Sequence, residues 1–178
     1  MRRFTPSAVL GACGGASLVA AGLVVMLGNG SSALGDEVNG QTQANVSVAS
    51  AITLTGLTPS FTLSGLPNTT ATQDKAVSYR VTTNNTLGYL VSVRADAAAL
   101  TAQDPANPDT IPISDLEVKP DEGVIWSPVG NNDVDVVHSK DSPSAAGGDL
   151  LQDDYRVHIR NVRSGTYSVT LTYTAATR

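Results

Sequence analysis

Cysteine, histidine and aromatic residues are scarce in this chain of 178 residues. The sequence holds one Cys and two His, and Phe, Trp and Tyr together make up 4% of it. A single Cys excludes an internal disulfide bond and any zinc site built on several Cys ligands. The shortage of aromatic side chains argues against a carbohydrate cleft, because such clefts normally present several of them.

Charged residues are also few, at 15% of the chain, and the formal net charge is −5. A nucleic-acid-binding surface needs clustered Lys and Arg, so this charge argues against a nucleic-acid partner. The sequence contains neither the Gly-x-Ser-x-Gly signature of a nucleophile nor the His-Glu-x-x-His signature of a zinc hydrolase. We therefore expect a non-enzymatic protein without an organic cofactor.

The N-terminal residues 1–35 have the order of a secretory signal peptide. Arg2 and Arg3 precede an uncharged stretch over 8–27, and the small residues Ala33 and Gly35 satisfy the rule for signal peptidase. We expect a signal helix that is cleaved after Gly35, which places the protein outside the cell or on its surface. The alternative is an uncleaved membrane anchor over 8–27, which is just long enough to span a bilayer. In either case, only this segment contacts a membrane.

Alternation of apolar and polar residues dominates the chain after a short polar linker at 36–44. It is clearest over 45–55, 77–93 and 155–174, with a shorter stretch around Phe61 and Leu63. This period of two is typical of antiparallel strands with one buried face. We predict an all-β domain over 45–178: a two-sheet antiparallel β-sandwich of immunoglobulin-like architecture with six to eight strands. The segments 77–93 and 155–174 are each predicted to form a hairpin, and 96–103 one or two helical turns.

An acidic, proline-rich segment interrupts this pattern at 104–154. It contains 12 of the 16 acidic residues and only Lys119 and Lys140 as bases, whereas the rest of the chain after Gly35 is net positive. Short strands are predicted at 116–118, 124–126 and 134–138, and exposed loops at 104–109 and 142–148. Loops at the ends of a sandwich are where binding residues are commonly placed.

One loop of this segment suggests a calcium site. Asn131, Asp133 and Asp135 offer amide and carboxylate oxygens at close spacing, and Ca²⁺ takes six to eight such ligands. The spacing matches no defined calcium loop, and a solvated acidic loop is the simpler interpretation. A calcium-dependent ligand-binding module is therefore an alternative function.

A small secreted hydrolase is a further alternative. Paired acids at Glu117 and Asp121, or at Asp153 and Asp154, are of the kind that glycoside hydrolysis uses. Of the two histidines, His138 and His158, the second lies on the polar face of its predicted strand. Five arginines are expected on outward faces, where their simplest role is solubility and protection of sheet edges: Arg80, Arg94, Arg156, Arg160 and Arg163.

Two stretches carry a resemblance to a known family. The sequence TTNNTLGYLVSV at 82–93 resembles a hairpin of bacterial WxL-type surface proteins, and YRVHI at 155–159 with SGTYSVTLTYTA at 164–175 resembles their closing hairpin. The resemblance implies an exported β-sandwich of surface type. The signal segment, the period-two strands and the lack of a catalytic signature lead us to expect that the protein acts by adhesion or association with a cell-wall polymer or another surface protein. The Trp-x-Leu motifs of that family are absent, because Trp126 is followed by Ser127 and Pro128.

Overall fold

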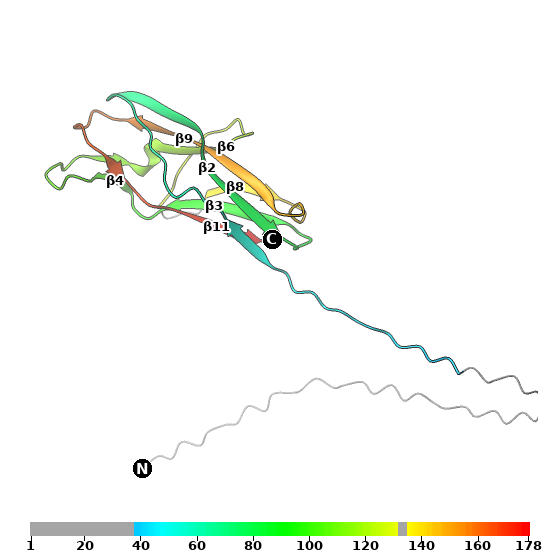
Figure 1. Ribbon diagram of the computed structural model, residues 1–178. Helices are drawn as coiled ribbons and strands as arrows, with labels where there is room; N and C mark the ends of the chain where they lie inside the picture. The colour runs from blue at the N-terminus through cyan, green and yellow to red at the C-terminus, as the bar shows by residue number, and fades with distance from the viewer. Residues whose placement is uncertain (1–37, 132–134) are drawn as a thin grey trace, which may run out of the picture. The chain divides into compact units, whose positions relative to one another are not determined.

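The computed structural model describes residues 38–131 and 135–178, and these residues form an all-β structure (Figure 1). Every strand pairing is antiparallel. A single 3₁₀ turn, η1 (Ile113–Asp115), accompanies the strands. The strands are β1 (Ile52–Thr55), β2 (Thr69–Thr83), β3 (Tyr89–Ala95), β4 (Ala99–Ala102), β5 (Thr110–Pro112), β6 (Leu116–Pro120), β7 (Ser127–Pro128), β8 (Asp135–Lys140), β9 (Asp149–Ile159), β10 (Tyr167–Ser168) and β11 (Leu171–Thr177). They outnumber the six to eight that were predicted, because several are only two to four residues long.

The signal peptide predicted at 1–35 lies outside the described residues. The same holds for the alternative membrane anchor at 8–27 and for the first two residues of the linker predicted at 36–44. Residues 38–45 contain no helix or strand and are exposed. Within 38–131 and 135–178, no helix is long and apolar enough to cross a membrane.

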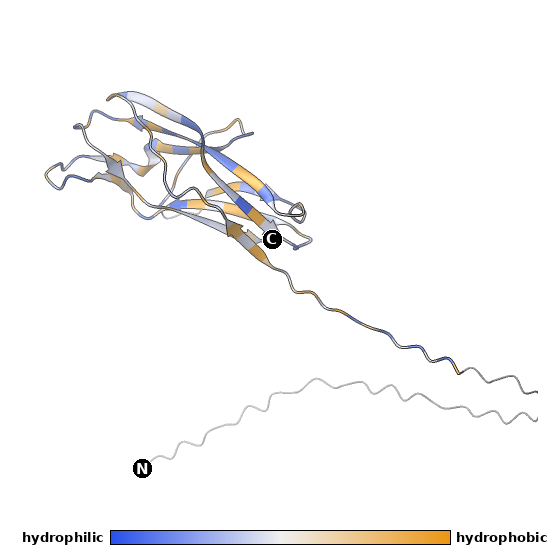
Figure 2. Cartoon of the chain, in the orientation of Figure 1, coloured by the Kyte–Doolittle hydropathy of each residue, from blue (hydrophilic) through white to orange (hydrophobic). Residues whose placement is uncertain are grey.

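The largest sheet has five strands in the order β1-β2-β9-β6-β7. Its centre is the long pair of β2 and β9, which runs from the partners Thr69 and Ile159 to Val81 and Asp149. Hydrophobic and hydrophilic residues alternate along these strands (Figure 2), so one face of the sheet is apolar.

Two three-stranded sheets, β11-β3-β8 and β10-β4-β5, complete the fold. They continue each other along the chain, since β3 leads into β4 and β10 leads into β11. At the junction, the Asp96 amide donates to the Thr170 carbonyl oxygen and the Thr170 amide donates to Asp96 Oδ1, each at 3.0 Å.

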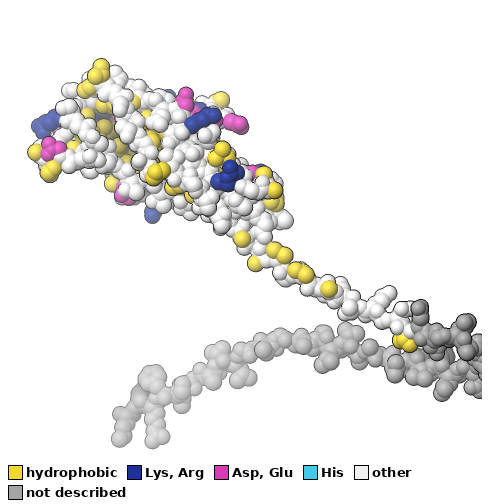
Figure 3. Space-filling model, in the orientation of Figure 1, with side chains coloured by type: hydrophobic (Ala, Val, Ile, Leu, Met, Phe, Trp, Pro, Cys, Tyr) yellow, Lys and Arg dark blue, Asp and Glu magenta, His cyan; other side chains and the backbone are white. Residues whose placement is uncertain are grey.

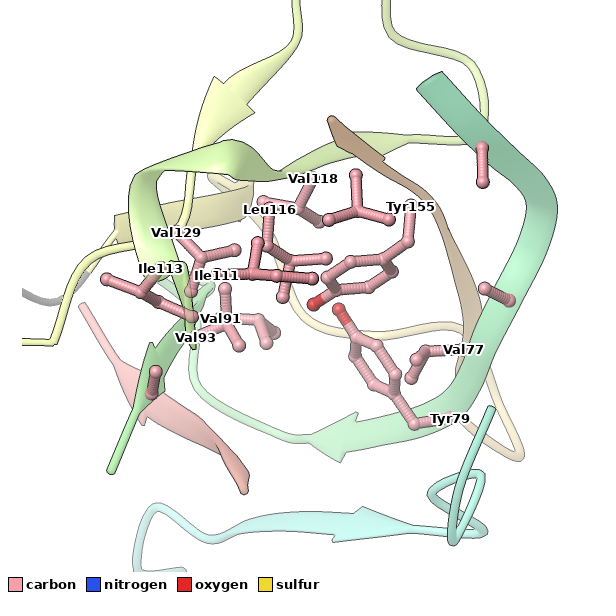
Figure 4. Packing of buried hydrophobic residues seen from close by; sticks show 14 of the residues in the cluster. Val77, Tyr79, Val91, Val93, Ile111, Ile113, Leu116, Val118, Val129 and Tyr155 are labelled. Atoms are coloured by element: carbon pink, nitrogen blue, oxygen red, sulfur yellow. The ribbon is translucent and has the colours of Figure 1, made fainter. Parts of the chain in front are cut away.

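The hydrophobic core combines side chains from the five-stranded sheet and the two smaller sheets. Tyr79 and Tyr155 enter from the five-stranded sheet, whereas Val91 and Val93 enter from β3 (Figure 4). These four side chains have almost no exposed surface. Burial of such residues contributes roughly 1.5–3 kcal/mol each to stability, so this contact holds the sheets together.

The two predicted hairpins are wrong, although their strands are present. β2 pairs with β1 and β9, whereas β3 pairs with β8 and β11, so the chain crosses from one sheet to another between Thr83 and Tyr89. The strands within 155–174 are likewise divided, because β9 belongs to the five-stranded sheet and β11 does not. The alternation of apolar and polar residues shows which face of a strand is buried, but it does not show which strand is its neighbour. Two strands of different sheets that bury side chains in one core have the same alternation as two strands of one hairpin.

Three further predictions are corrected. The strand expected over 45–55 begins only at Ile52, and the helical turns expected over 96–103 are replaced by β4, which pairs with β5 and β10. Val124 and Ile125 are exposed, and the strand nearby is Ser127–Pro128 instead. Tertiary pairing outweighs the helix propensity of the three alanines at 97–99.

Candidate functional site

The segment 57–67, which we call the strap, joins β1 to β2 without forming a strand (Figure 1). Its ends are fixed, because the Thr58 amide donates to the Ser78 carbonyl oxygen at 3.0 Å and the Asn68 amide donates to the Ile159 carbonyl oxygen at 2.7 Å. Between them the Phe61 ring packs on the ring of Tyr155, with centroids 4.6 Å apart. In the described part of the chain, no backbone hydrogen bond joins 59–65 to a neighbouring strand.

A groove of about 880 Å³ lies between the strap and the segment 162–171. This volume is within the range of ligand-binding clefts. In Figure 3, the face over the strap and β4 shows hydrophobic side chains, with charged groups toward its margins. Strands of all three sheets contribute apolar side chains to the groove: Val77, Leu100, Ile111, Leu116, Val157 and Tyr173.

One wall of the groove is an unpaired sheet edge. β10 and β11 are the outer strands of their sheets, and no strand of the described residues is hydrogen-bonded to their second side, although β1 lies close to part of β11. Residues 164–177 contain no charged residue and no proline, although these are the usual protection of an edge. Three of the other outer strands carry such protection: β5 and β7 each contain a proline, and β8 contains Asp135 and Lys140.

A buried polar cluster lies beneath the groove. Tyr173 lines the groove, and its hydroxyl reaches inward to donate to Asp153 Oδ2 at 3.1 Å. The Tyr155 hydroxyl lies 2.6 Å from that of Tyr173 and donates to it, because Tyr173 has already used its single proton. His138 Nε2 approaches Asp153 Oδ1 at 2.7 Å, and Asp153 itself has no exposed surface.

The tyrosines of this cluster stay protonated. Burial raises the pKa of Tyr173, and the neighbouring Tyr155 and Asp153 raise it further. Burial, followed by the charge of Asp153, also raises the pKa of Tyr79. The hydroxyls of Tyr79 and Tyr155 point toward each other in the interior (Figure 4), and that of Tyr79 has no hydrogen-bond partner among the described residues. The cluster therefore surrounds one buried carboxyl group with His138 and protonated tyrosine hydroxyls, and it links the sheets through β2, β8, β9 and β11.

The predicted calcium ligands lie mostly outside the described residues. Asn131 is described and half-buried, whereas Asp133 and the side chain of Asp135 are not described. Among the described residues, no group of three or more His, Cys, Asp or Glu side chains is placed to hold a metal ion. Calcium binding by this loop stays a prediction.

The acids considered for hydrolysis each contact a base. Glu117 is ion-paired with Arg156, and Asp121 with Lys75 at 3.0 Å. Asp153 and Asp154 have separate partners, because Asp153 contacts His138 while Asp154 contacts Lys119 at 2.5 Å. His158 is exposed, as its position on the strand predicted.

Ion pairs join the acidic segment 104–154 to the basic strands. Seven ion pairs of the described residues join a Lys or Arg to an acid of this segment, and five of those bases lie outside the segment: Lys75, Arg156, Arg160, Arg163 and Arg178. Arg160 is paired with Asp115, and Arg163 lies 4.0 Å from Asp109. The two regions of opposite charge in the sequence thus lie against each other.

Asp154 on β9 lies opposite a bulge-like irregularity in β2. There, the three residues 74–76 of β2 are opposite this one residue of β9, and Lys75 adopts a φ of 50°. The Lys75 amide donates to Asp154 Oδ1 at 2.7 Å. Burial acts to raise the pKa of Asp154, but hydrogen bonds from Lys119 and from the Lys75 amide outweigh it, so the pKa is lowered.

This lowered pKa predicts acid sensitivity. A carboxyl group with a lower pKa in the folded state stabilises the fold above the unfolded pKa of about 3.9, and this contribution is lost as the pH falls through the folded pKa. We expect the free energy of unfolding to fall below pH ~4 and Asp154→Asn to make that fall less steep. Urea unfolding at a series of pH values measures both slopes. If the free energy of unfolding of Asp154→Asn falls with pH as steeply as that of the unaltered protein, the assignment to Asp154 is wrong. The control is Asp74→Asn, which removes an exposed carboxyl group and should leave the slope unchanged.

Sequence reasoning missed the groove and the cluster. The signals for the groove were the alternation of Phe61 and Leu63 between Pro59 and Pro67, and the uncharged stretch at 164–177. The signal for the cluster in the sequence is weaker. Asp153 is the one polar residue among the alternating positions Leu151, Asp153, Tyr155, Val157 and Ile159.

Comparison with known proteins assigns no family to the chain. A scan against protein-family models found no match, and a search of curated proteins found none either. The resemblance to WxL-type surface proteins stays a prediction.

Proposed function

We propose that this protein is an exported, non-enzymatic β-sandwich that acts at or outside the cell surface by binding an extended polypeptide segment in the groove. In this proposal the five-stranded sheet forms one layer and the two three-stranded sheets form the other. The observation that carries the proposal is the unprotected edge of β10 and β11 beside an apolar groove. An edge strand offers backbone hydrogen bonds to an added strand, while the groove accepts every second side chain.

The lining favours a polypeptide over a wall polymer. Within 38–131 and 135–178, Arg163 is the one charged residue that lines the groove, whereas an anionic polymer needs several cations to balance its charge. Of the three aromatic rings that line the groove, Phe61 and Tyr173 are turned to the interior, where they pack on or bond to Tyr155. The third, Tyr167, is half-buried and its hydroxyl donates to the Arg163 carbonyl oxygen at 2.7 Å, so the groove has no pair of exposed rings between which a sugar could stack.

The buried cluster supports a binding role. Asp153 has no exposed surface, so a substrate in the groove contacts Tyr173 and not the carboxyl group behind it. The His138–Asp153 pair has Tyr173 as its neighbour, and that hydroxyl is held protonated. This arrangement stabilises the wall of the groove instead of activating a nucleophile. The signal peptide predicted at 1–35 supports action outside the cell.

The groove is tested by placing a charge in it. Val169→Lys puts an ammonium group on the groove wall between β10 and β11, and we expect it to weaken peptide binding by about tenfold or more, since desolvating a charge is costly. The probe is a library of uncharged eight-residue peptides with alternating apolar residues, with binding measured by fluorescence anisotropy.

The matched control is Val136→Lys on β8, the outer strand at the other side of the β11-β3-β8 sheet, where Val136 is 57% exposed. This control should bind as the unaltered protein does, and thermal unfolding verifies that both variants are folded. Equal binding by the two variants would refute the groove as the site. Retention on purified cell-wall glycan with no peptide binding would reassign the function to carbohydrate recognition.

A further inference from the structure

Residues 46–51, which we call the donor segment, have a strand sequence but no strand partner. Val46 and Val48 alternate with serine and alanine and are 87% and 76% exposed. The alternation continues into β1, yet the ladder with β2 begins only at Ile52. β-branched residues at this spacing are typical of a half-buried strand. The donor segment therefore lacks the apolar surface that its sequence is suited to cover.

The donor segment cannot cover the groove of its own copy. The Ala51 amide donates to Asn84 Oδ1 at 2.8 Å and Asn84 Nδ2 donates to the Ala49 carbonyl oxygen at 2.9 Å, which fixes it beyond the last residue of β2. The groove begins seven residues earlier along β2, at Val77, a distance of about 23 Å. The three residues before Ala49 reach only about 10 Å.

The groove and the donor segment match in chemistry. Residues 38–73 contain no charged residue, so the donor segment brings no charge into a groove that is itself lined by one charged residue. The edge of β10 and β11 needs a strand partner, and the donor segment is an unpaired strand. Ser47 and Ala49 stand on the face opposite to Val46 and Val48, which suits a strand with one side toward solvent.

We infer that the donor segment of one copy occupies the groove of a second copy and adds a strand to β10 and β11. This inference rests on the proposed function and names the polypeptide that the groove takes. Because donor segment and groove lie toward opposite ends of β2, the contact is head-to-tail, and each added copy leaves a new groove free. The protein thereby assembles into open chains.

The test is the mass of the exported protein in solution, measured by sedimentation over a range of concentrations. We expect the mass of the unaltered protein to rise with concentration. Val46→Asp with Val48→Asp should abolish that rise, since it places two charges in the groove. The matched control, Val38→Asp with Gln41→Asp, adds the same charge to exposed residues outside the donor segment and should assemble normally. All of these positions lie outside the strands, so folding is not at risk.

A mixing experiment tests the direction of the contact. The Val46→Asp, Val48→Asp variant retains a groove, and the Val169→Lys variant retains a donor segment. Each alone should remain a single copy, and their mixture should form a species of two copies and no longer chain. The inference is overturned if the unaltered protein stays a single copy at every concentration, if the donor variant assembles as the unaltered protein does, or if the mixture forms no pair.

Failure of this inference is distinguishable from failure of the proposed function. If the protein does not assemble but library peptides still bind in a way that Val169→Lys abolishes, the groove binds another polypeptide and only the inference falls. If neither assembly nor groove-dependent peptide binding occurs, both fall.

Discussion

Replacing Gly88 with alanine is expected to lower the free energy of unfolding by about 3 kcal/mol or more. Gly88 has a φ of 86° and ends the connection by which the chain crosses from β2 to β3. A Cβ at this position would lie 1.8 Å from the Lys140 carbonyl oxygen. Because this oxygen belongs to the backbone of β8, it cannot move aside as the end of a flexible side chain could. The substitution therefore adds a steric clash to the strain of a left-handed conformation.

Gly147 is the matched control for this prediction. It has the same φ of 86°, but a Cβ there meets nothing within 4 Å. Gly147→Ala should therefore cost only the conformational strain, about 1–2 kcal/mol. Urea unfolding of both variants measures the difference. Equal losses of stability would show that Gly88 is not confined by β8 and that the crossing between the sheets is looser than described.

Removing the buried carboxyl group is expected to have an effect of similar size. Asp153→Ala leaves His138 Nε2 and the Tyr173 hydroxyl without their acceptor, at a carboxyl group that has no exposed surface. Unpaired buried donors cost roughly 1–3 kcal/mol each, so we expect a loss of about 3 kcal/mol. Because the cluster joins β2 and β9 of the five-stranded sheet to β8 and β11 of a three-stranded sheet, the loss should appear in global unfolding, measured by urea titration.

Two variants keep this second prediction specific. Asp153→Asn retains the shape and one acceptor oxygen, so it should cost less than Asp153→Ala. Asp74→Ala removes the same charge from an exposed position and should change stability by less than about 0.5 kcal/mol. A loss in Asp153→Ala no greater than in Asp74→Ala would mean that the cluster contributes nothing to the fold.

The sequence predicted the all-β character of the fold because the alternation is a local signal. Val77, Tyr79 and Val81 are buried and Arg80 is exposed, as the period of two requires. The pairing of strands was not predictable in the same way. Tyr79 and Val91 have the same local pattern, but they enter the core from different sheets, and only the tertiary fold decides that.

The candidate site was beyond the sequence for a related reason. Its two walls, the strap and the segment 162–171, are about a hundred residues apart in the chain, and neither contains a motif. Asp153 and Asp154 look equivalent in the sequence, yet the irregularity at Lys75 gives Asp154 a backbone donor while Asp153 enters the core. Val46 and Val48 were predicted to pair, and the structure leaves them exposed.

The central claim is that the edge of β10 and β11 is a strand-binding site, and amide hydrogen exchange tests it most directly. The exported protein, kept dilute enough to remain a single copy, is measured with and without a peptide of residues 44–52. We predict slower exchange over 166–173 when the peptide is added, and no such change in Val169→Lys. Exchange over 166–173 that is already slow without peptide, or that the peptide does not alter, would contradict the claim.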